Sequence, residues 1–140
     1  MLSPDQIINQ MMEKDSFSKW LGIKIEDIQK GSCILSLTVK KEMLNGFDIA
    51  HGGTCYSLAD SALAFAANSH GKKAVSIETS ISHTNKVLCG DKLTAHTKEL
   101  NKTSKIGLYS IEITNQEKLI VAQFKGTWRS CYSFLNPSFT

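Results

Sequence analysis

The spacing of apolar residues along the chain changes twice, and each change marks a boundary between expected elements. In residues 4–14 the apolar positions 7, 8, 11 and 12 recur at helical spacing, and Ser3 followed by Pro4 is a suitable helix start. Residues 17–22 are expected to connect this helix to the next element and to add a further turn. The N-terminal helical segment, residues 1–20, therefore precedes all the predicted strands.

Alternation of apolar and polar residues then predicts strands. Ile23 and Ile25 belong to the first arm of a hairpin, the pair Lys30-Gly31 is its turn, and residues 32–40 are its second arm. Four further strand-like runs, separated by short polar turns, occupy residues 74–85, 92–100, 105–115 and 118–128.

A long helix is predicted between the hairpin and these four strands. Residues 45–53 are expected to form a loop, and residues 54–70, with five alanines, a helix of about five turns that ends at Gly71. His70 would interact with the dipole at that end. Strands joined by short turns form an antiparallel sheet, and one central helix must cover one of its faces. The predicted fold class is α+β, an antiparallel sheet wrapped around one long central helix.

Length and charge narrow the class of protein. A chain of 140 residues fits a single domain, residues 1–140, with residues 130–140 as a C-terminal tail that shows no period. The net charge is only +3, and no basic cluster reaches the density of a nucleic-acid-binding patch. No secretory signal or membrane-spanning stretch is recognised, and the four cysteines are scattered. We expect a cytoplasmic protein that binds neither nucleic acid nor membrane.

The predicted central helix contains a single charged residue, Asp60, and no other lies between Asp48 and Lys72. None of its neighbours at helical spacing is a cation that could balance it. A carboxylate in a helix that is packed on most sides is costly unless it is paired, hydrogen-bonded or protonated. Asp60 is therefore either a local cap or seam residue, or a carboxylate of raised pKa that acts as a base or nucleophile at a ligand site.

The sequence His51-Gly52-Gly53 leads into the start of this helix, where backbone N–H groups lack internal partners and the dipole is positive. Glycines let a ligand approach the main chain, so such an end can stabilise a developing oxyanion. Asp60 lies about two helical turns further on, roughly 10 Å away at the standard rise. A site shared between two subunits would bring the two groups together.

At these residues the chain resembles the hotdog-fold acyl-CoA thioesterases, and among them the phenylacetic-acid-degradation subgroup. The resemblance extends from about Phe17 to Trp128. It rests on the following segments: Met43-Leu44-Asn45-Gly46, His51-Gly52-Gly53, Ser57-Leu58-Ala59-Asp60 and Gly90-Asp91-Lys92-Leu93. The resemblance implies a hydrolase of acyl-CoA thioesters with a hotdog fold. It also implies a homodimer with shared active sites, paired again into a homotetramer.

The resemblance also implies a role for each matching residue. Asp60 would be the catalytic carboxylate, and the N–H of Gly52 would hold the thioester carbonyl oxygen. Asn45 would help to hold the water or the carbonyl, His51 would orient the thioester end, and Ser76 would assist the water. Asn45, His51 and Gly52 would come from one subunit, Asp60 and Ser76 from the other.

Two further residues are expected to contact the CoA part of the substrate, namely Gly53 and Lys86. Where relatives often carry Arg-Pro, this chain has Asn85-Lys86, so Lys86 is the expected substitute for phosphate binding. Coenzyme A enters as part of the substrate, and no separate cofactor or metal is expected.

Several alternatives stay open or are disfavoured at this point. Asp60 could act as a general base or as a nucleophile, and the acyl group, aryl-acyl or medium to long acyl, is undetermined. Cys55 and Ser57 have no neighbouring base in sequence and no nucleophile elbow, so neither is expected to be a nucleophile. A hotdog hydratase is disfavoured because His51 precedes the helix. A non-hydrolytic acyl-CoA-binding or regulatory protein is the alternative function.

Overall fold

The structure, a computed structural model, describes residues 1–131 of the chain. Three helices, one short 3-10 helix and six strands follow one another along the chain. They are α1 (Pro4–Lys14), α2 (Ser16–Leu21), β1 (Lys24–Gln29), β2 (Ser32–Thr38), η1 (Lys41–Met43), α3 (Gly52–Asn68), β3 (Ala74–His83), β4 (Lys92–Lys102), β5 (Ile106–Thr114) and β6 (Ile120–Ser130). The predicted tail, residues 130–140, lies outside the described residues except for Ser130, which ends β6, and Cys131.

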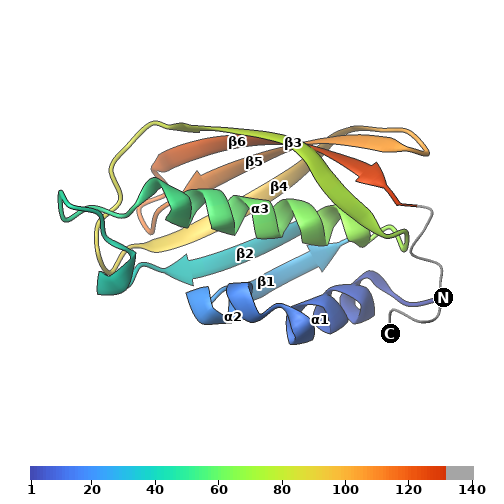
Figure 1. Cartoon of the computed structure of the whole chain (residues 1–140), viewed down its shortest axis with the longest axis horizontal. Helices are drawn as coiled ribbons and strands as arrows, with labels where there is room; N and C mark the ends of the chain where they lie inside the picture. Colours follow the sequence, from blue (N-terminus) through green and yellow to red (C-terminus); the bar gives the residue numbers. More distant parts are fainter. Residues whose placement is uncertain (132–140) are drawn as a thin grey trace.

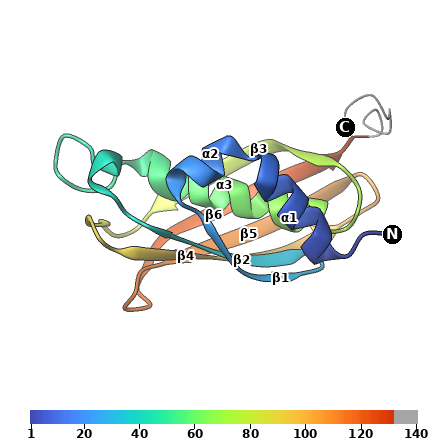
Figure 2. The same ribbon diagram turned by 90° about the horizontal axis from the view of Figure 1, so that it is seen from below.

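The six strands form one antiparallel sheet in the order β1-β2-β4-β5-β6-β3. The sheet curves behind α3, which runs across its concave face (Figure 1). The helices α1 and α2 lie on the same side of the sheet as α3 and cover it near β1, as the view from below shows (Figure 2). The predicted α+β architecture, a sheet wrapped around one long helix, is confirmed.

The core lies between α3 and the sheet and follows the alternation in the sequence. Along β5 every second residue is buried, and Tyr109, Ile111 and Ile113 all point inward with no exposed surface. Gly126 of β6 allows the helix to come close, because a Cβ there would lie 2.4 Å from a methyl carbon of Leu63. This close packing fixes the height of α3 above the sheet and so the position of its two ends.

The N-terminal helix begins as the sequence predicts. Ser3 is the N-cap of α1 and forms a capping box with Gln6, and Pro4 is the first helical residue. The extra turn expected after it forms a separate helix, α2. The hydroxyl oxygen of Ser18 on α2 lies 2.8 Å from the hydroxyl oxygen of Ser61 on α3. The contact between Ser18 and Ser61 ties the N-terminal helices to the middle of α3.

Both ends of α3 differ from the prediction. The helix begins at Gly52 instead of residue 54, because His51 acts as its N-cap and draws both glycines into the first turn. At the other end Ser69, not Gly71, is the C-cap. His70 does not serve the helix dipole as expected: its Nε2 atom lies 2.6 Å from the carboxylate of Glu99 on β4.

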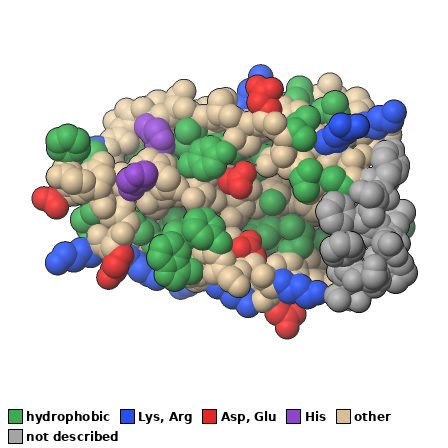
Figure 3. Space-filling view, in the orientation of Figure 1, with side chains coloured by type: hydrophobic (Ala, Val, Ile, Leu, Met, Phe, Trp, Pro, Cys, Tyr) green, Lys and Arg blue, Asp and Glu red, His purple; other side chains and the backbone are tan. Residues whose placement is uncertain are grey.

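Strand β3 forms one edge of the sheet and is exposed over most of its length. Two apolar residues of this strand, Val75 and Ile77, keep 49% and 54% of their surface exposed. Hydrophobic side chains also gather over α3 on the face drawn in Figure 3, whereas Lys and Arg lie towards its margins. None of the helices within residues 1–131 is long and apolar enough to cross a membrane.

Candidate active site

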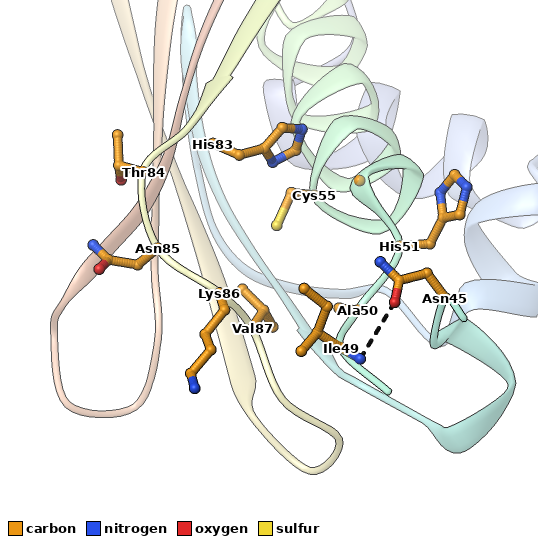
Figure 4. Close-up of a pocket in the computed structure, with 11 residues that line it drawn as sticks. Asn45, Ile49, Ala50, His51, Cys55, His83, Thr84, Asn85, Lys86 and Val87 are labelled. Atoms are coloured by element: carbon orange, nitrogen blue, oxygen red, sulfur yellow. Dashed lines mark hydrogen bonds between the residues drawn. The ribbon is translucent and has the colours of Figure 1, made fainter. Parts of the chain in front are cut away.

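A cavity of about 390 Å³ lies at the N-terminal end of α3. Its walls come from three segments that are distant in the sequence: the loop before α3, the first turn of α3, and the chain between β3 and β4 (Figure 4). The lining residues are Asn45, Ile49, Ala50, His51, Gly52, Cys55, His83, Thr84, Asn85, Lys86 and Val87. Four of the seven residues predicted from the sequence are thus brought together here.

Asn45 is held by the loop that it closes. Its Oδ1 atom accepts hydrogen bonds from the N–H groups of Phe47 at 2.9 Å and Ile49 at 3.4 Å. These bonds fix which end of the amide faces the loop, since only the oxygen can accept. The amide nitrogen has no acceptor among the described residues, and it points toward the cavity in Figure 4. Asn45 is therefore oriented to bind an oxygen of a ligand.

His51 is fixed by the helix that it caps. Its Nδ1 atom accepts a hydrogen bond of 2.9 Å from the N–H of Gly53. Because Nδ1 must keep its lone pair to accept, the proton of the neutral ring lies on Nε2. Because the N–H of Gly53 donates to His51, it is not available to bind a ligand. Gly53 instead provides room, because a Cβ there would lie 3.0 Å from Nδ1 of His51.

The N–H of Gly52 differs from its neighbours in the first turn of α3. The N–H of Gly53 is bound by His51, and that of Thr54 donates to the His51 carbonyl at 2.9 Å. Within the described part of the chain, the N–H of Gly52 has no acceptor. It lies at the positive end of a 17-residue helix and at the wall of the cavity. It can therefore stabilise negative charge on a ligand oxygen.

Asp60 and Ser76 are not part of this cavity, and no carboxylate from residues 1–131 lines it. Asp60 is eight residues further along α3 than Gly52, which corresponds to about 12 Å of helix rise. Ser76 is exposed on β3 and is paired in register with Trp128. The structure thus separates the predicted residues into two groups on one chain, with Asn45, His51, Gly52 and Lys86 in one group and Asp60 and Ser76 in the other.

The carboxylate of Asp60 is half-buried on α3. Among residues 1–131 it has neither a hydrogen-bond donor nor a cation as a partner. Burial removes water from the carboxylate and raises the pKa of Asp60 above its usual value. One turn before it, the hydroxyl of Tyr56 lies 2.5 Å from that of Thr79 on β3, so this face of α3 packs beside β3. An unpaired carboxylate of raised pKa suits a base or nucleophile.

Among the cavity-wall residues that were not singled out from the sequence as site residues, His83 and Cys55 carry reactive side chains. His83 ends β3 and Cys55 belongs to the first turns of α3; burial raises the pKa of the Cys55 thiol to about 11, so it stays protonated. No sequence pattern distinguished His83 from its neighbours, because it lies within a predicted strand. The departure noted at Asn85-Lys86 was the nearest clue in the sequence. Residues 1–131 contain no cluster of three side chains that could bind a metal ion.

Comparison with known proteins identifies the family. Residues 47–122 match the thioesterase superfamily. Over 121 residues the chain is 40% identical to the acyl-coenzyme A thioesterase PaaI of Escherichia coli K12, covering 86% of each protein. The chain belongs to the thioesterase superfamily. The predicted class, a thioester hydrolase, is thereby confirmed.

The fold of this thioesterase is also found in solved structures. The E. coli PaaI protein from the phenylacetic acid degradation operon superimposes with a TM-score of 0.90 at 38% identity, covering 91% of this chain and 93% of that one. A Streptococcus mutans protein bound to acetyl CoA superimposes with a TM-score of 0.76 at 26% identity, covering 78% and 88%. The predicted hotdog fold and the resemblance to the phenylacetic-acid-degradation thioesterases are confirmed.

Proposed function

We propose that this thioesterase hydrolyses an acyl-CoA thioester to the free acid and CoA. The observation that carries the proposal is the free N–H of Gly52, which lies in the cavity wall at the positive end of α3. A carbonyl oxygen bound there gains negative charge when its carbon is attacked, and a donor placed in advance stabilises that charge. Asn45 and His51 supply further donors on the same wall.

The reaction requires one more group, a carboxylate, and we assign it to Asp60. As a general base it takes a proton from water while the water oxygen bonds to the carbonyl carbon; the C–S bond then breaks and the proton passes to the leaving thiolate. As a nucleophile its oxygen bonds to the carbonyl carbon, the C–S bond breaks and CoA leaves as the thiolate; water then hydrolyses the anhydride to the free acid and the Asp60 carboxylate, and a proton of that water passes to the thiolate. Sulfur is a good leaving group, so neither route needs a metal. Ser76 would position the water in either case.

A complete site requires two subunits. Gly52 and Asp60 of one chain are about 12 Å apart along the helix, so both cannot reach one carbonyl group. In a homodimer Asp60 and Ser76 of the partner subunit would face the cavity. The exposed edge strand β3, with Val75 and Ile77, supports this arrangement because pairing would cover its apolar side chains. We also propose that two such dimers associate into a homotetramer.

The choice of an acyl-CoA substrate rests on the relatives and on the charge at the cavity mouth. The E. coli relative is an acyl-coenzyme A thioesterase, and the S. mutans structure contains acetyl CoA. Lys86 lines the cavity, and its ammonium group points outward in Figure 4, where CoA phosphates would lie. Gly53, the other residue expected to contact CoA, does not line the cavity, and the space beside it is taken by the His51 ring, so the charge argument rests on Lys86. We further propose that the acyl group is aryl-acyl or medium to long acyl. A cytoplasmic location is also part of the proposal.

The decisive experiment is release of free thiol from phenylacetyl-CoA, benzoyl-CoA and decanoyl-CoA. We expect turnover by the wild type and loss of most of kcat in Asp60→Asn. The exposed residue Asp27 on β1 offers a matched control, and Asp27→Asn should keep wild-type kcat. Near-normal turnover by Asp60→Asn would refute the assignment of the carboxylate. Binding of these thioesters without release by the wild type would instead support the non-hydrolytic alternative.

A second experiment tests whether the site is shared. Asp60→Asn and Asn45→Ala chains are co-expressed with different affinity tags, and the mixed population is assayed. If Asn45 of one chain works with Asp60 of the other, each heterodimer has one intact site, and random pairing restores about a quarter of wild-type activity. Activity no higher than the mean of the two variants would show that each site belongs to a single chain.

A further inference from the structure

His83 lies against the first residue of α3. A Cβ on Gly52 would be 3.2 Å from Nε2 of His83, 3.6 Å from Cε1 and 3.9 Å from Cδ2. The outer edge of the imidazole ring therefore faces Gly52. His83 and His51 lie on opposite sides of the first turn of α3 (Figure 4). Unlike Nδ1 of His51, the ring nitrogens of His83 take part in no hydrogen bond within residues 1–131.

The backbone around His83 is held in place by β6. His83 pairs in register with Ala122, and the N–H of Thr84 donates to the carbonyl of Val121 at 2.9 Å. Just beyond, the amide of Asn85 donates to the carbonyl of Ile120 at 2.8 Å. The ring is therefore carried by a fixed strand end, as a preorganised donor requires.

The distances allow one oxygen to contact both Gly52 and His83. The amide nitrogen of Gly52 lies about 2.5 Å from its own Cβ position by standard covalent geometry. Adding the 3.2 Å from that position to Nε2 puts the two nitrogens at most about 5.7 Å apart. An oxygen at about 2.9 Å from each donor fits between nitrogens up to about 5.8 Å apart.

We propose that His83 is a catalytic residue that completes the oxyanion hole, donating its Nε2–H to the thioester carbonyl oxygen that the N–H of Gly52 also binds. The inference deepens the proposed function and rests on it. When the carbonyl carbon is attacked, its π electrons move to the oxygen, and they return when the C–S bond breaks and the thiolate leaves. His83 keeps its proton throughout, so the thiolate's proton comes from the water.

The hydrogen bond strengthens as the oxygen becomes charged, so its loss lowers kcat more than it raises KM. The test compares His83→Phe and His83→Gln with His96→Phe, which makes the same change at an exposed histidine of β4 outside the cavity. The substrate is whichever of phenylacetyl-CoA, benzoyl-CoA and decanoyl-CoA the wild type hydrolyses fastest. We expect His83→Phe to lose about 100-fold in kcat with little change in KM.

The Gln variant separates hydrogen bonding from packing. Its amide can place an N–H near the position of Nε2, so we expect it to recover about a tenth of wild-type kcat. His96→Phe should match the wild type. Equal losses in the Phe and Gln variants, an unchanged kcat in His83→Phe, or a rise in KM alone would each overturn the inference. A wild type that hydrolyses none of the three thioesters would refute the proposed function, and the catalytic role of His83 with it.

A spectroscopic measurement reads the hydrogen bond without turnover. Phenylacetyl-CoA with a ¹³C carbonyl is bound to Asp60→Asn and to Asp60→Asn/His83→Phe, and the carbonyl stretch is recorded by difference infrared spectroscopy. A hydrogen bond from His83 polarises the carbonyl, so the stretch should lie at lower frequency in the single variant. Equal frequencies would refute contact between His83 and the carbonyl even if the protein is an active thioesterase.

Discussion

Nδ1 of His51 accepts a hydrogen bond of 2.9 Å from the N–H of Gly53, two residues further along the chain. This bond has two consequences at the start of α3. It removes Gly53 from the set of available donors and leaves Gly52 as the residue at the cavity wall whose N–H has no acceptor within residues 1–131. It also fixes the proton of neutral His51 on Nε2. The same hydrogen bond therefore caps α3 and fixes the orientation of the His51 ring in the cavity wall.

The two roles of His51 can be separated by substitution. We expect His51→Ala to lower the free energy of unfolding by about 1 kcal/mol through loss of the cap, and His51→Asn to keep it, since Asn is a good N-cap. Both variants should lose activity because neither carries an Nε2–H. Urea unfolding and thiol release provide the measurements. An Asn variant with full activity would show that His51 acts only as a cap.

Gly52→Ala should stabilise the fold and weaken catalysis. Gly52 has a helical backbone, and Ala is favoured over Gly in a helix by up to about 1 kcal/mol. The new Cβ would crowd Nε2 of His83 at 3.2 Å and displace the ring. We expect a higher Tm and a lower kcat. In a His83→Ala background the same change should lower kcat no further, because the group that it displaces is gone. Equal effects of Gly52→Ala in both backgrounds would contradict a coupling between Gly52 and His83.

Asp60→Asn should raise stability at neutral pH while it abolishes turnover. Burial raises the pKa of Asp60 above its usual value of 3.8, so the folded state binds the proton more tightly than the unfolded chain. Stability of the wild type therefore falls as the pH rises through that raised pKa. The Asn variant does not lose this stability, because its side chain does not ionise. We expect the difference in Tm between variant and wild type to be largest near pH 7 and to shrink as the pH falls towards 3.8. A lower Tm for Asp60→Asn at pH 7 would contradict this.

At the other end of α3, Glu99 accepts hydrogen bonds from Tyr109 at 2.5 Å and from His70 at 2.6 Å. Burial opposes ionisation of Glu99, but these bonds outweigh it and hold its pKa below the usual 4.5. The stability from this cluster is present above pH 4.5 and lost as the pH falls. Tyr109→Phe should cost about 1 to 2 kcal/mol at pH 7 and less in acid, as measured by urea unfolding. A loss that is the same at all pH values would indicate packing alone.

Sequence patterns predicted the elements of the fold and four of the residues that line the cavity, namely Asn45, His51, Gly52 and Lys86. Alternation predicted the strand that β5 forms within residues 105–115, and the charge pattern singled out Asp60. Both are local properties that follow from the period of a strand or helix. The exact start of α3 was missed because His is not a preferred N-cap and Gly is a poor helix former. The role of His70 was missed because its partner, Glu99, is 29 residues away.

The tertiary structure alone decided what meets at the cavity. His83 reaches Gly52 because β3 pairs with β6 in a register that ends β3 beside the start of α3. No spacing in the sequence encodes that contact, since it depends on how the sheet curves and how closely α3 packs on it. The sequence by itself predicted Asp60 and the segment His51-Gly52-Gly53 as candidate groups, because an isolated charge and paired glycines are local features. The rise of a single helix already separates Gly52 from Asp60 of the same chain, whereas long-range pairing and close packing determined that Gly52 and His83 lie together.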